Sequence, residues 1–184
     1  MQKRVFLLTG VPGVGKTTVL IKAVDSLKSK GIAVGGMVSR EVRAGNVRVG
    51  FEIVDLTSNK HGWLSHINQK SGPQVGKYHV NVQDLESVGA QAIADAIEKH
   101  SVVVIDEIGP MELFSQKFRQ SVKQALESRK LVLAIIHGKS RDSLIQIAAE
   151  RNDAEILEVT LSNREIMPEK LTKQVVAVLN QHVK

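Results

Sequence analysis

The feature that most constrains this chain is a glycine-rich turn directly behind a short apolar run. Residues 5–18 read VFLLTGVPGVGKTT, and within them Gly10, Gly15, Lys16 and Thr17 match the phosphate-loop pattern G-x-x-x-x-G-K-[ST]. A continuous apolar run that ends in glycine is typical of a strand buried on both faces of a parallel sheet. The stretch therefore predicts a strand, a phosphate-binding loop and a helix in succession.

Each position of the loop has a chemical task. Glycines let the backbone turn tightly and bring its N–H groups against phosphate oxygens, and the following helix points its N-terminal amides at the same anion. Lys16 is expected to neutralise the β- and γ-phosphates, and the Thr17 hydroxyl is expected to bind Mg²⁺. We therefore expect the nucleotide to be held by Gly10, Val11, Pro12, Gly13, Val14, Gly15, Lys16, Thr17 and Thr18.

A second apolar run carries two consecutive carboxylates at its end. Residues 101–109 read SVVVIDEIG, which predicts another buried strand. Asp106 is placed to serve the metal by holding a Mg²⁺-bound water from the far side, and Glu107 is placed to act as a general base or to orient the attacking water. A strand-end cap and a solvated carboxylate are the simpler interpretations of the two. Together with the phosphate loop, however, the pair favours hydrolysis of a terminal phosphate.

The rest of the chain alternates strands with helices. Apolar runs at 32–39, 131–137 and 154–160 predict further strands, and stretches with helical periodicity follow them. Pro168 fits the first turn of a final helix. The order predicts an α/β fold with a predominantly parallel sheet and helices on both faces, formed by a single domain over residues 1–184.

Two segments interrupt this order. Residues 47–53 alternate apolar and polar side chains, and Ala44-Gly45-Asn46 is a turn signal, so they predict an antiparallel hairpin with the preceding strand. We expect this hairpin at an edge of the sheet or over the site. Residues 57–80 are rich in Gly, Pro, Ser, Asn and His, which predicts a long loop with a short strand near Tyr78–Val82.

Charge and composition limit which classes of molecule this chain is expected to bind. The net charge is +6, aromatic residues are 3% and there is no Cys. A basic balance suits polyphosphate as well as nucleic acid, and the Lys and Arg are spread along the chain without interleaved aromatics, so nucleic acid is the less favoured partner. The lack of Cys excludes a disulfide scaffold and is compatible with a reducing cytoplasm. No apolar run reaches the ~18–20 residues of a membrane span, so we expect a cytoplasmic protein that acts away from membranes.

Other side chains are candidates for contact with the γ-phosphate. His137, Lys139 and Arg141 follow a predicted strand whose end lies at the phosphate side of a parallel sheet. Arg40 or Arg43 is a candidate for an arginine finger in cis, although hairpin charges that face solvent are the simpler interpretation.

Taken in order, the motifs resemble the small nucleoside-triphosphatase family, which has archaeal and bacterial members and a vertebrate form called cancer-related nucleoside-triphosphatase. The resemblance rests on GVPGVGKTT, GMVSREVR, VRVGFEIVDL, VVIDEIGPMELFSQKF and VTLSNRE, which span nearly the whole chain. It implies Mg²⁺-dependent release of phosphate from ATP, GTP, CTP and UTP with loose base choice. It also implies a RecA-like sheet, with a strand inserted between the phosphate-loop strand and the Asp106 strand, and Glu107 as the water-activating residue.

The resemblance extends to the end of the chain, with two departures. Asn163 and Arg164 match the family's Asn-Arg pair and are candidates to stack on the base or border it. Pro110 stands where vertebrate relatives are expected to carry Lys. Residues 137–142, which read HGKSRD, stand where relatives are expected to carry a Thr-Ile-Pro run. The resemblance therefore does not identify which residue contacts the γ-phosphate.

Two rival functions use the same loop. A small-molecule or nucleoside kinase protects the γ-phosphate from water and needs a lid with paired arginines. Arg141 and Arg151 are the candidates, but the segment between them has a plain helical pattern. A nucleic-acid-linked ATP switch is supported mainly by the basic charge, and its activity would rise on addition of RNA or DNA.

Overall fold

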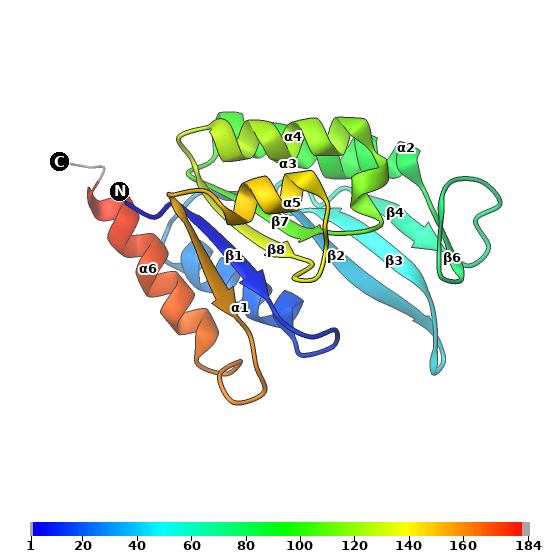
Figure 1. The fold of residues 1–184 in the computed structure, drawn as a ribbon, viewed down its shortest axis with the longest axis horizontal. Helices are drawn as coiled ribbons and strands as arrows, with labels where there is room; N and C mark the ends of the chain where they lie inside the picture. Colours follow the sequence, from blue (N-terminus) through cyan, green and yellow to red (C-terminus); the bar gives the residue numbers. More distant parts are fainter. Residues whose placement is uncertain (1, 182–184) are drawn as a thin grey trace.

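One mixed sheet forms the centre of the protein in the computed structural model, which describes residues 2–181 (Figure 1). The nine strands of this part of the chain lie in the order β5-β6-β4-β3-β2-β7-β8-β1-β9. Their bounds are β1 Val5–Thr9, β2 Val34–Ala44, β3 Val47–Asp55, β4 His61–His66, β5 Gln74–Val75, β6 Tyr78–Val80, β7 Val102–Ile108, β8 Leu131–Ile136 and β9 Ala154–Glu158.

Helices cover both faces of the sheet, as the sequence predicts. Helices α1 and α6 pack on one face, and α3, α4 and α5 lie on the other (Figure 1). Between residues 2 and 181, no helix has the length and apolar character needed to cross a membrane. The helical elements are α1 Lys16–Ser29, α2 Val82–Asp84, a π-helix Leu85–Ala90, α3 Gln91–Lys99, a 3-10 turn Glu112–Phe114, α4 Gln116–Glu127, α5 Ser143–Ala149 and α6 Met167–Gln181.

The parallel half of the sheet consists of β2, β7, β8, β1 and β9. Strand β8 pairs with β1 on one side and with β7 on the other, which confirms the inserted strand implied by the family resemblance. Every residue of β8 is buried, because helices cover both of its faces. The phosphate loop follows β1, and the two carboxylates lie near the end of β7. Both therefore lie at the carboxyl ends of the parallel strands.

Alternation along these strands sorts their side chains into two cores. On β1, Val5 and Leu7 belong to the core under α3, α4 and α5, whereas Phe6 and Leu8 belong to the core under α1 and α6. Successive side chains of a strand point to opposite faces, so a residue at a strand end inherits a defined side. This rule determines which strand-end residues share a side with α1.

The predicted hairpin is present, and it is not the edge of the sheet. Strands β2 and β3 pair antiparallel around the turn at Gly45-Asn46. Strand β4 then pairs with β3, and β6 and β5 follow, so an antiparallel extension (β3, β4, β6 and β5) widens the sheet. The base of the hairpin nevertheless adjoins the carboxylates of β7, since β2 pairs with β7 up to Met37.

The prediction of one long loop over residues 57–80 was wrong in part. The segment contains β4 and β5 in addition to the expected short strand at Tyr78–Val80. Strand β4 lacks a clean apolar alternation because the register between β3 and β4 shifts between Phe51 and Glu52. As a result Leu64 and Ser65 are both buried, and the Ser65 hydroxyl contacts Met111 Sδ at 3.3 Å.

Candidate functional site

The loop between β1 and α1 has the backbone that its sequence predicts. Gly10, Gly13 and Gly15 all have positive φ values, of 146°, 76° and 107°. At Gly10 a side chain would also meet backbone, since a Cβ there would lie 2.5 Å from the Val159 carbonyl oxygen. Val14 is buried in the core under α1 and anchors the loop. Helix α1 begins directly behind the loop, so its free N-terminal amides face the loop.

Lys16 folds back over this loop. Its ammonium donates to the carbonyl oxygens of Gly10 at 3.0 Å and Val11 at 3.2 Å. These contacts keep a positive charge against the same backbone that carries the free amides. A loop of this kind is an anion site, because amide dipoles and an ammonium converge on one place.

Thr17 and Asp106 meet across the gap between α1 and β7. The Thr17 hydroxyl donates to Asp106 Oδ1 at 3.0 Å, and the backbone N–H of Ser39 donates to Oδ2 at 3.2 Å. Burial raises the pKa of Asp106 to about 7, although the bonds from Ser39 and Thr17 oppose that shift. The negative charge of neighbouring Glu107 raises the pKa further. A hydroxyl and a carboxylate at this distance are the hard oxygen ligands that Mg²⁺ prefers.

A β-bulge lies at the two carboxylates. Ile105 pairs with Ala134 and Ile108 with Ile136, so β7 has one more residue than β8 between these pairs. Ile105 and Ile108 consequently belong to the same core, which strict alternation would not allow. Bulges of this kind re-aim side chains next to active sites. Here the bulge lets consecutive carboxylates stand at the sheet edge while the apolar residues on either side remain buried.

Glu112 is a buried carboxyl that sequence reasoning did not single out. It lies in the 3-10 turn after β7 and is 4% exposed. Burial raises the pKa of Glu112 to about 8, and the charges of Glu107 and Asp106 add to the shift. Glu112 is therefore largely protonated at neutral pH. No sequence pattern marks Glu112 as a buried acid, because its burial comes from the tertiary fold.

The loop after β9 lies against the phosphate loop. Asn163 Oδ1 accepts from the Thr160 N–H at 2.8 Å, and its Nδ2 donates to the Glu158 carbonyl oxygen at 2.9 Å. The amide of Asn163 thus fixes the shape of this loop. Arg164 Cδ lies 3.9 Å from the position that a Cβ of Gly15 would occupy, which brings Arg164 to the start of α1.

The two hairpin arginines differ in their contacts. Arg43 pairs with Glu41 and also donates to the Asn46 carbonyl oxygen at 3.0 Å, so its guanidinium is held within the hairpin. Arg40 lies opposite Glu52 in the β2–β3 ladder, and Glu52 is engaged with His61 Nδ1 at 2.8 Å. Both arginines are exposed to solvent, and the guanidinium of Arg43 is held by its contacts with Glu41 and Asn46.

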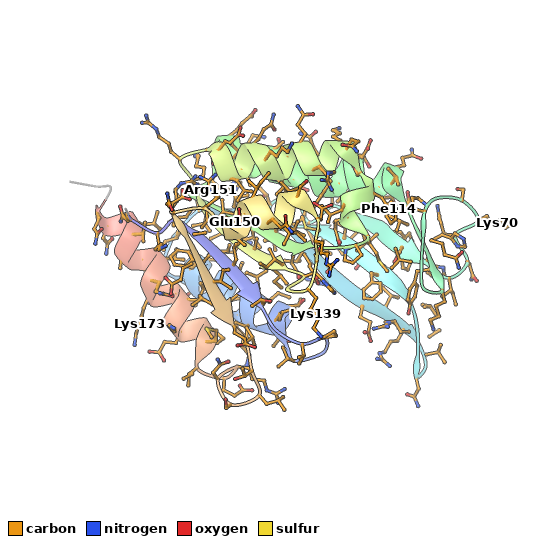
Figure 2. All side chains as sticks on the ribbon, in the orientation of Figure 1. Lys70, Phe114, Lys139, Glu150, Arg151 and Lys173 are labelled. Atoms are coloured by element: carbon orange, nitrogen blue, oxygen red, sulfur yellow. The ribbon has the colours of Figure 1, made fainter. Side chains whose placement is uncertain are left out.

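The loop after β8 is tied down at its far end. Asp142 caps α5 by accepting from the Leu144 N–H at 2.9 Å, and Arg119 of α4 binds both carboxylate oxygens of Asp142 at 2.8 and 3.1 Å. Lys139, labelled in Figure 2, extends from this loop at the end of the molecule that carries the loop after β1. His137 begins the loop, immediately beyond the last residue of β8.

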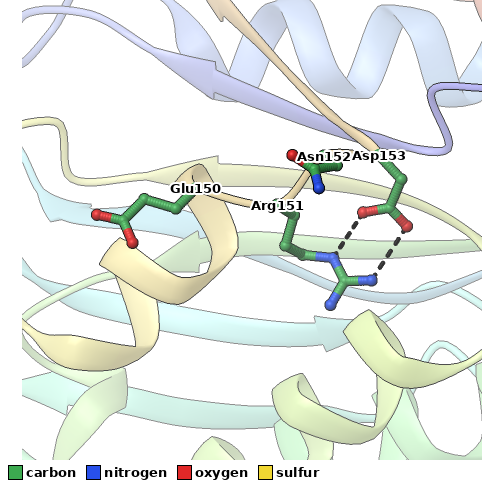
Figure 3. A pocket seen from close by; sticks show the side chains of 4 residues that line it. All are labelled: Glu150, Arg151, Asn152 and Asp153. Atoms are coloured by element: carbon green, nitrogen blue, oxygen red, sulfur yellow. Dashed lines mark hydrogen bonds and ion pairs between the residues drawn. The ribbon is translucent and has the colours of Figure 1, made fainter. Parts of the chain in front are cut away.

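A pocket of about 330 Å³ lies away from these residues, at the start of β9 (Figure 3). Its lining is an ion-pair network, in which Arg151 binds Asp153 at 2.8 and 3.0 Å and Arg4 binds the same carboxylate at 2.8 Å. In open α/β sheets ligands bind outside the carboxyl ends of the strands, and this pocket is at the amino end of β9. We therefore assign a structural role to this pocket and not a ligand-binding one.

The comparisons with known proteins agree with this geometry. A family model described as NTPase matches residues 5–172. The chain belongs to this NTPase family. The match begins at the strand before the phosphate loop and ends within α6, so it includes both the loop and the two carboxylates of β7.

Curated relatives in this family match almost end to end. A nucleoside-triphosphatase THEP1 of Thermofilum pendens is 46% identical over 180 residues, covering 97% of this chain and 99% of the relative. A protein of the same name from Methanosarcina acetivorans is 48% identical over 168 residues, covering 91% of this chain and 94% of the relative.

Solved structures of the family have the same fold. The crystal structure of THEP1 from Aquifex aeolicus has a TM-score of 0.80 at 32% identity, covering 93% of this chain and 98% of that one. The solution structure of a human cancer-related nucleoside triphosphatase has a TM-score of 0.77 at 38% identity, covering 92% and 96%. The resemblance stated from the motifs is confirmed, and so is the P-loop NTPase fold with its mostly parallel sheet.

Proposed function

We propose that this chain, as a single P-loop domain, hydrolyses nucleoside triphosphates to the diphosphate and inorganic phosphate. The observation that carries the proposal is the hydrogen bond between Thr17 and Asp106, with Glu107 next to it on the bulge of β7. This contact joins the phosphate loop to the carboxylate strand at one edge of the sheet. The description of the family as NTPase and the names of its curated relatives support the same reaction.

The donor set of the site fits Mg²⁺. Thr17 Oγ1 and Asp106 Oδ1 are the protein atoms that would hold the Mg²⁺ ion, together with phosphate oxygens of the substrate. When bound, Mg²⁺ neutralises charge on the phosphate oxygens. The raised pKa of Asp106 belongs to the metal-free carboxyl, whose buried charge has only hydrogen bonds to stabilise it.

Lys16 takes part in both substrate binding and catalysis, and Glu107 acts in catalysis. The backbone N–H groups of residues 10–18, except Pro12, which has none, and the Lys16 ammonium hold the phosphates and stabilise charge on the transferring group. Glu107 orients a water molecule for in-line attack and takes one of its protons. The water oxygen bonds to the γ-phosphorus while the bond from that phosphorus to the β–γ bridging oxygen breaks. The nucleoside diphosphate leaves with the electron pair of that bond.

We further propose that the base is bound loosely, so that ATP, GTP, CTP and UTP are all substrates. Arg164 lies beside the start of α1 and offers a guanidinium plane on which any base can stack. The polar atoms of Asn163 are already engaged with Thr160 and Glu158, so Asn163 positions this loop instead of reading a base edge.

The test is phosphate release from each of the four triphosphates with Mg²⁺, for the wild type and for Glu107→Gln. We expect release from all four by the wild type and a loss of about 10²–10⁴-fold in kcat for Glu107→Gln. The affinity of Mg²⁺–ADP, measured by calorimetry, should be unchanged in the variant and serves as the control. Normal turnover by Glu107→Gln would remove Glu107 from the mechanism. Tight binding without release by the wild type would favour a kinase that lacks its acceptor.

A further inference from the structure

Within residues 2–181, one face of the antiparallel extension has no helix packed on it. On β3, Ile53 lies in the core under α3, α4 and α5, so Glu52 points to the opposite side, the side of α1. Helix α2 and the π-helix pack against the Ile53 side of β3 and β4. The core under α1 and α6 reaches Val38 of β2 and Val54 of β3, but in the described part of the chain it includes no residue of β4, β5 or β6. Beyond these two valines the sheet is therefore open on the side of α1.

Direct cross-strand partners place particular side chains on this open side. Arg40 of β2 pairs with Glu52, and Glu52 pairs with Trp63 of β4. Directly opposite residues point to the same side of a sheet, so these three form one row across it. A second row lies one step nearer the hairpin turn and consists of Val42, Gly50, His66 and His79. We call the two rows together the open face.

Trp63 and His66 lie over Gly50 and join the two rows. Their rings meet edge to face with centres 4.7 Å apart. A Cβ on Gly50 would lie 3.1 Å from Trp63 Cζ3 and 3.0 Å from His66 Cδ2, so the glycine is what lets the two rings rest against the sheet. Trp63 is nevertheless 38% exposed, and part of its surface is open to a ligand.

The open face begins next to the carboxylates of β7. Ser39 precedes Arg40 in β2, and the backbone N–H of Ser39 donates to Asp106 Oδ2 at 3.2 Å. The first row of the open face is therefore one residue from the point where β2 contacts Asp106. A ligand on this face would be a neighbour of the phosphate loop site without using the residues of that site.

The charge around the open face is complementary to a polyanion. Residues 56–83, which form β4, β5 and β6 with their loops, contain three Lys, three His and no Asp or Glu, so they hold half of the net charge of +6. Lys70 extends from the loop at the outer end of this segment (Figure 2). In the part of the chain that the structure describes, Arg40 forms no ion pair, whereas Glu52 is engaged with His61 Nδ1 at 2.8 Å.

His66 adds a hydrogen-bond donor to this face. Its Nδ1 accepts from the Asn68 N–H at 3.0 Å, which places the proton of a neutral imidazole on Nε2. The Nε2–H of His66 makes no printed contact of its own with the strands beside it, and it can donate to an anionic oxygen.

An exposed indole beside a guanidinium without an ion pair suits single-stranded nucleic acid. Aromatic rings stack on bases of any sequence, and cationic side chains follow the backbone phosphates. A second copy of this chain fits less well, because Trp63 and Val42 are the only large apolar side chains of the open face, too few for a stable protein interface. The sequence alone favours nucleic acid less, because Arg40, Trp63 and His66 come together only through strand pairing.

We propose that the open face binds single-stranded nucleic acid, with one base stacked on Trp63 and backbone phosphates held by Arg40 and by the Nε2–H of His66. The site is separate from the phosphate loop, and the proposal does not depend on the proposed hydrolysis.

The chain carries its own probe for a test. Trp63 is the only Trp in the sequence, so its fluorescence reports contact at the open face. Oligonucleotides of about 12 residues, oligo(dT) and oligo(U), are titrated into the protein, and a duplex of the same length is the control. We expect the single strands to quench Trp63 and the duplex to quench it far less, because its bases are already stacked on one another. Anisotropy of a labelled oligonucleotide measures the affinity of variants that lack Trp63.

Substitutions separate stacking from charge. Trp63→Ala should weaken binding about 10-fold or more, and Trp63→Phe, which keeps a ring, should restore most of the loss. Arg40→Ala, at an exposed position, should weaken binding and lower the slope of log affinity against log salt by about 0.7, as expected for one lost phosphate contact. Phe114→Ala and Arg129→Ala, at exposed positions outside the open face, are the matched controls and should leave the affinity and the slope unchanged (Figure 2).

Three outcomes would overturn the proposal. One is wild-type affinity for the single strands in both Trp63→Ala and Arg40→Ala. Another is equal binding of the single strand and the duplex. The third is a change in Trp63 emission that follows protein concentration without any oligonucleotide, which would place a second copy of the chain on the open face. All titrations are made without a nucleoside triphosphate, so a failure of the proposed hydrolysis would leave their interpretation unchanged.

Discussion

The parallel half of the sheet and the antiparallel extension differ in burial and in strand length. Strands β1, β7 and β8 are buried almost throughout, with helices on both faces. In the extension, β3 begins with exposed residues and β5 and β6 are only two and three residues long. The proposed phosphate and metal ligands come from the parallel half, which supplies rigid strand ends.

The extension has its own cluster of polar and aromatic side chains. Arg48 donates to the Tyr78 hydroxyl at 2.8 Å and pairs with Glu41 at 3.1 Å, and its guanidinium lies 5.1 Å from the centre of the Phe51 ring. Phe51 and Tyr78 pack edge to face with their ring centres 5.4 Å apart. The two regions thus differ in what their side chains do. The parallel half places the proposed reactive side chains at the carboxyl ends of its strands, whereas side-chain contacts hold the short strands of the extension together.

Loss of the loop lysine should have the largest effect on the parallel half. Lys16→Ala removes the ammonium that lies over the phosphate loop, so we expect affinity for Mg²⁺–ATP and phosphate release to fall together by about 100-fold or more. Calorimetry and a phosphate-release assay measure the two. Wild-type binding by the variant would contradict the assignment of the loop.

A matched pair of valines tests the packing difference. Val132→Ala removes two methyl groups from a fully buried position of β8, and we expect the free energy of unfolding to fall by about 2 kcal/mol. Val47→Ala, at a position of β3 that is 56% exposed, should change it by less than about 0.5 kcal/mol. Urea denaturation measures both. Similar losses would mean that the hairpin packs more tightly in solution than its exposure indicates.

The buried acid of the site gives the parallel half a distinct pH dependence. Because the pKa of Glu112 is raised to about 8, the folded protein binds a proton that the unfolded chain has released above about pH 4.5. Its contribution to stability is therefore present at low pH and is lost as pH rises towards 8, by up to about 1.4 kcal/mol per pH unit.

Glu112→Gln should remove this part of the decline and leave the part due to Asp106. Urea denaturation at pH 5, 6, 7 and 8 would show the change, with the exposed Glu98→Gln as the control. A variant whose stability falls with pH as steeply as the wild type would mean that Glu112 is ionised in the folded protein.

The smallest effect on phosphate release is expected for a substitution in the extension. Arg48→Ala loses its contacts with Glu41 and Tyr78, and we expect a cost of about 1 kcal/mol in the free energy of unfolding, because the pair is partly exposed. Phosphate release should stay within about 2-fold of the wild type. A large fall in kcat would mean that the extension takes part in the reaction.

Most of the parallel half could be predicted from local patterns. VFLLT and LVLAII are apolar runs of strand length, and the glycines and lysine of the phosphate loop have a fixed spacing. Such features depend only on neighbours in the sequence. The strand order, with β8 between β1 and β7, came from the family resemblance and not from any pattern in the residues.

The remainder depends on pairing between distant residues. Strand β4 was missed because a register shift against β3 buries Leu64 and Ser65 together, which removes the alternation that marks a strand. The bulge at Asp106 and Glu107 has the same origin, since it exists only in relation to β8. Glu112 is buried by the tertiary fold, and no periodic pattern distinguishes it from a solvated acid.

Strand β2 belongs to both halves. Val34–Met37 pair with β7, and the strand then runs on to the hairpin turn beside β3 alone. Between these parts, the Ser39 amide donates to the Asp106 carboxylate. Its proton is therefore a built-in reporter: in an isotope-labelled sample, the chemical shift and exchange rate of this one amide would follow the state of Asp106 without an attached probe group.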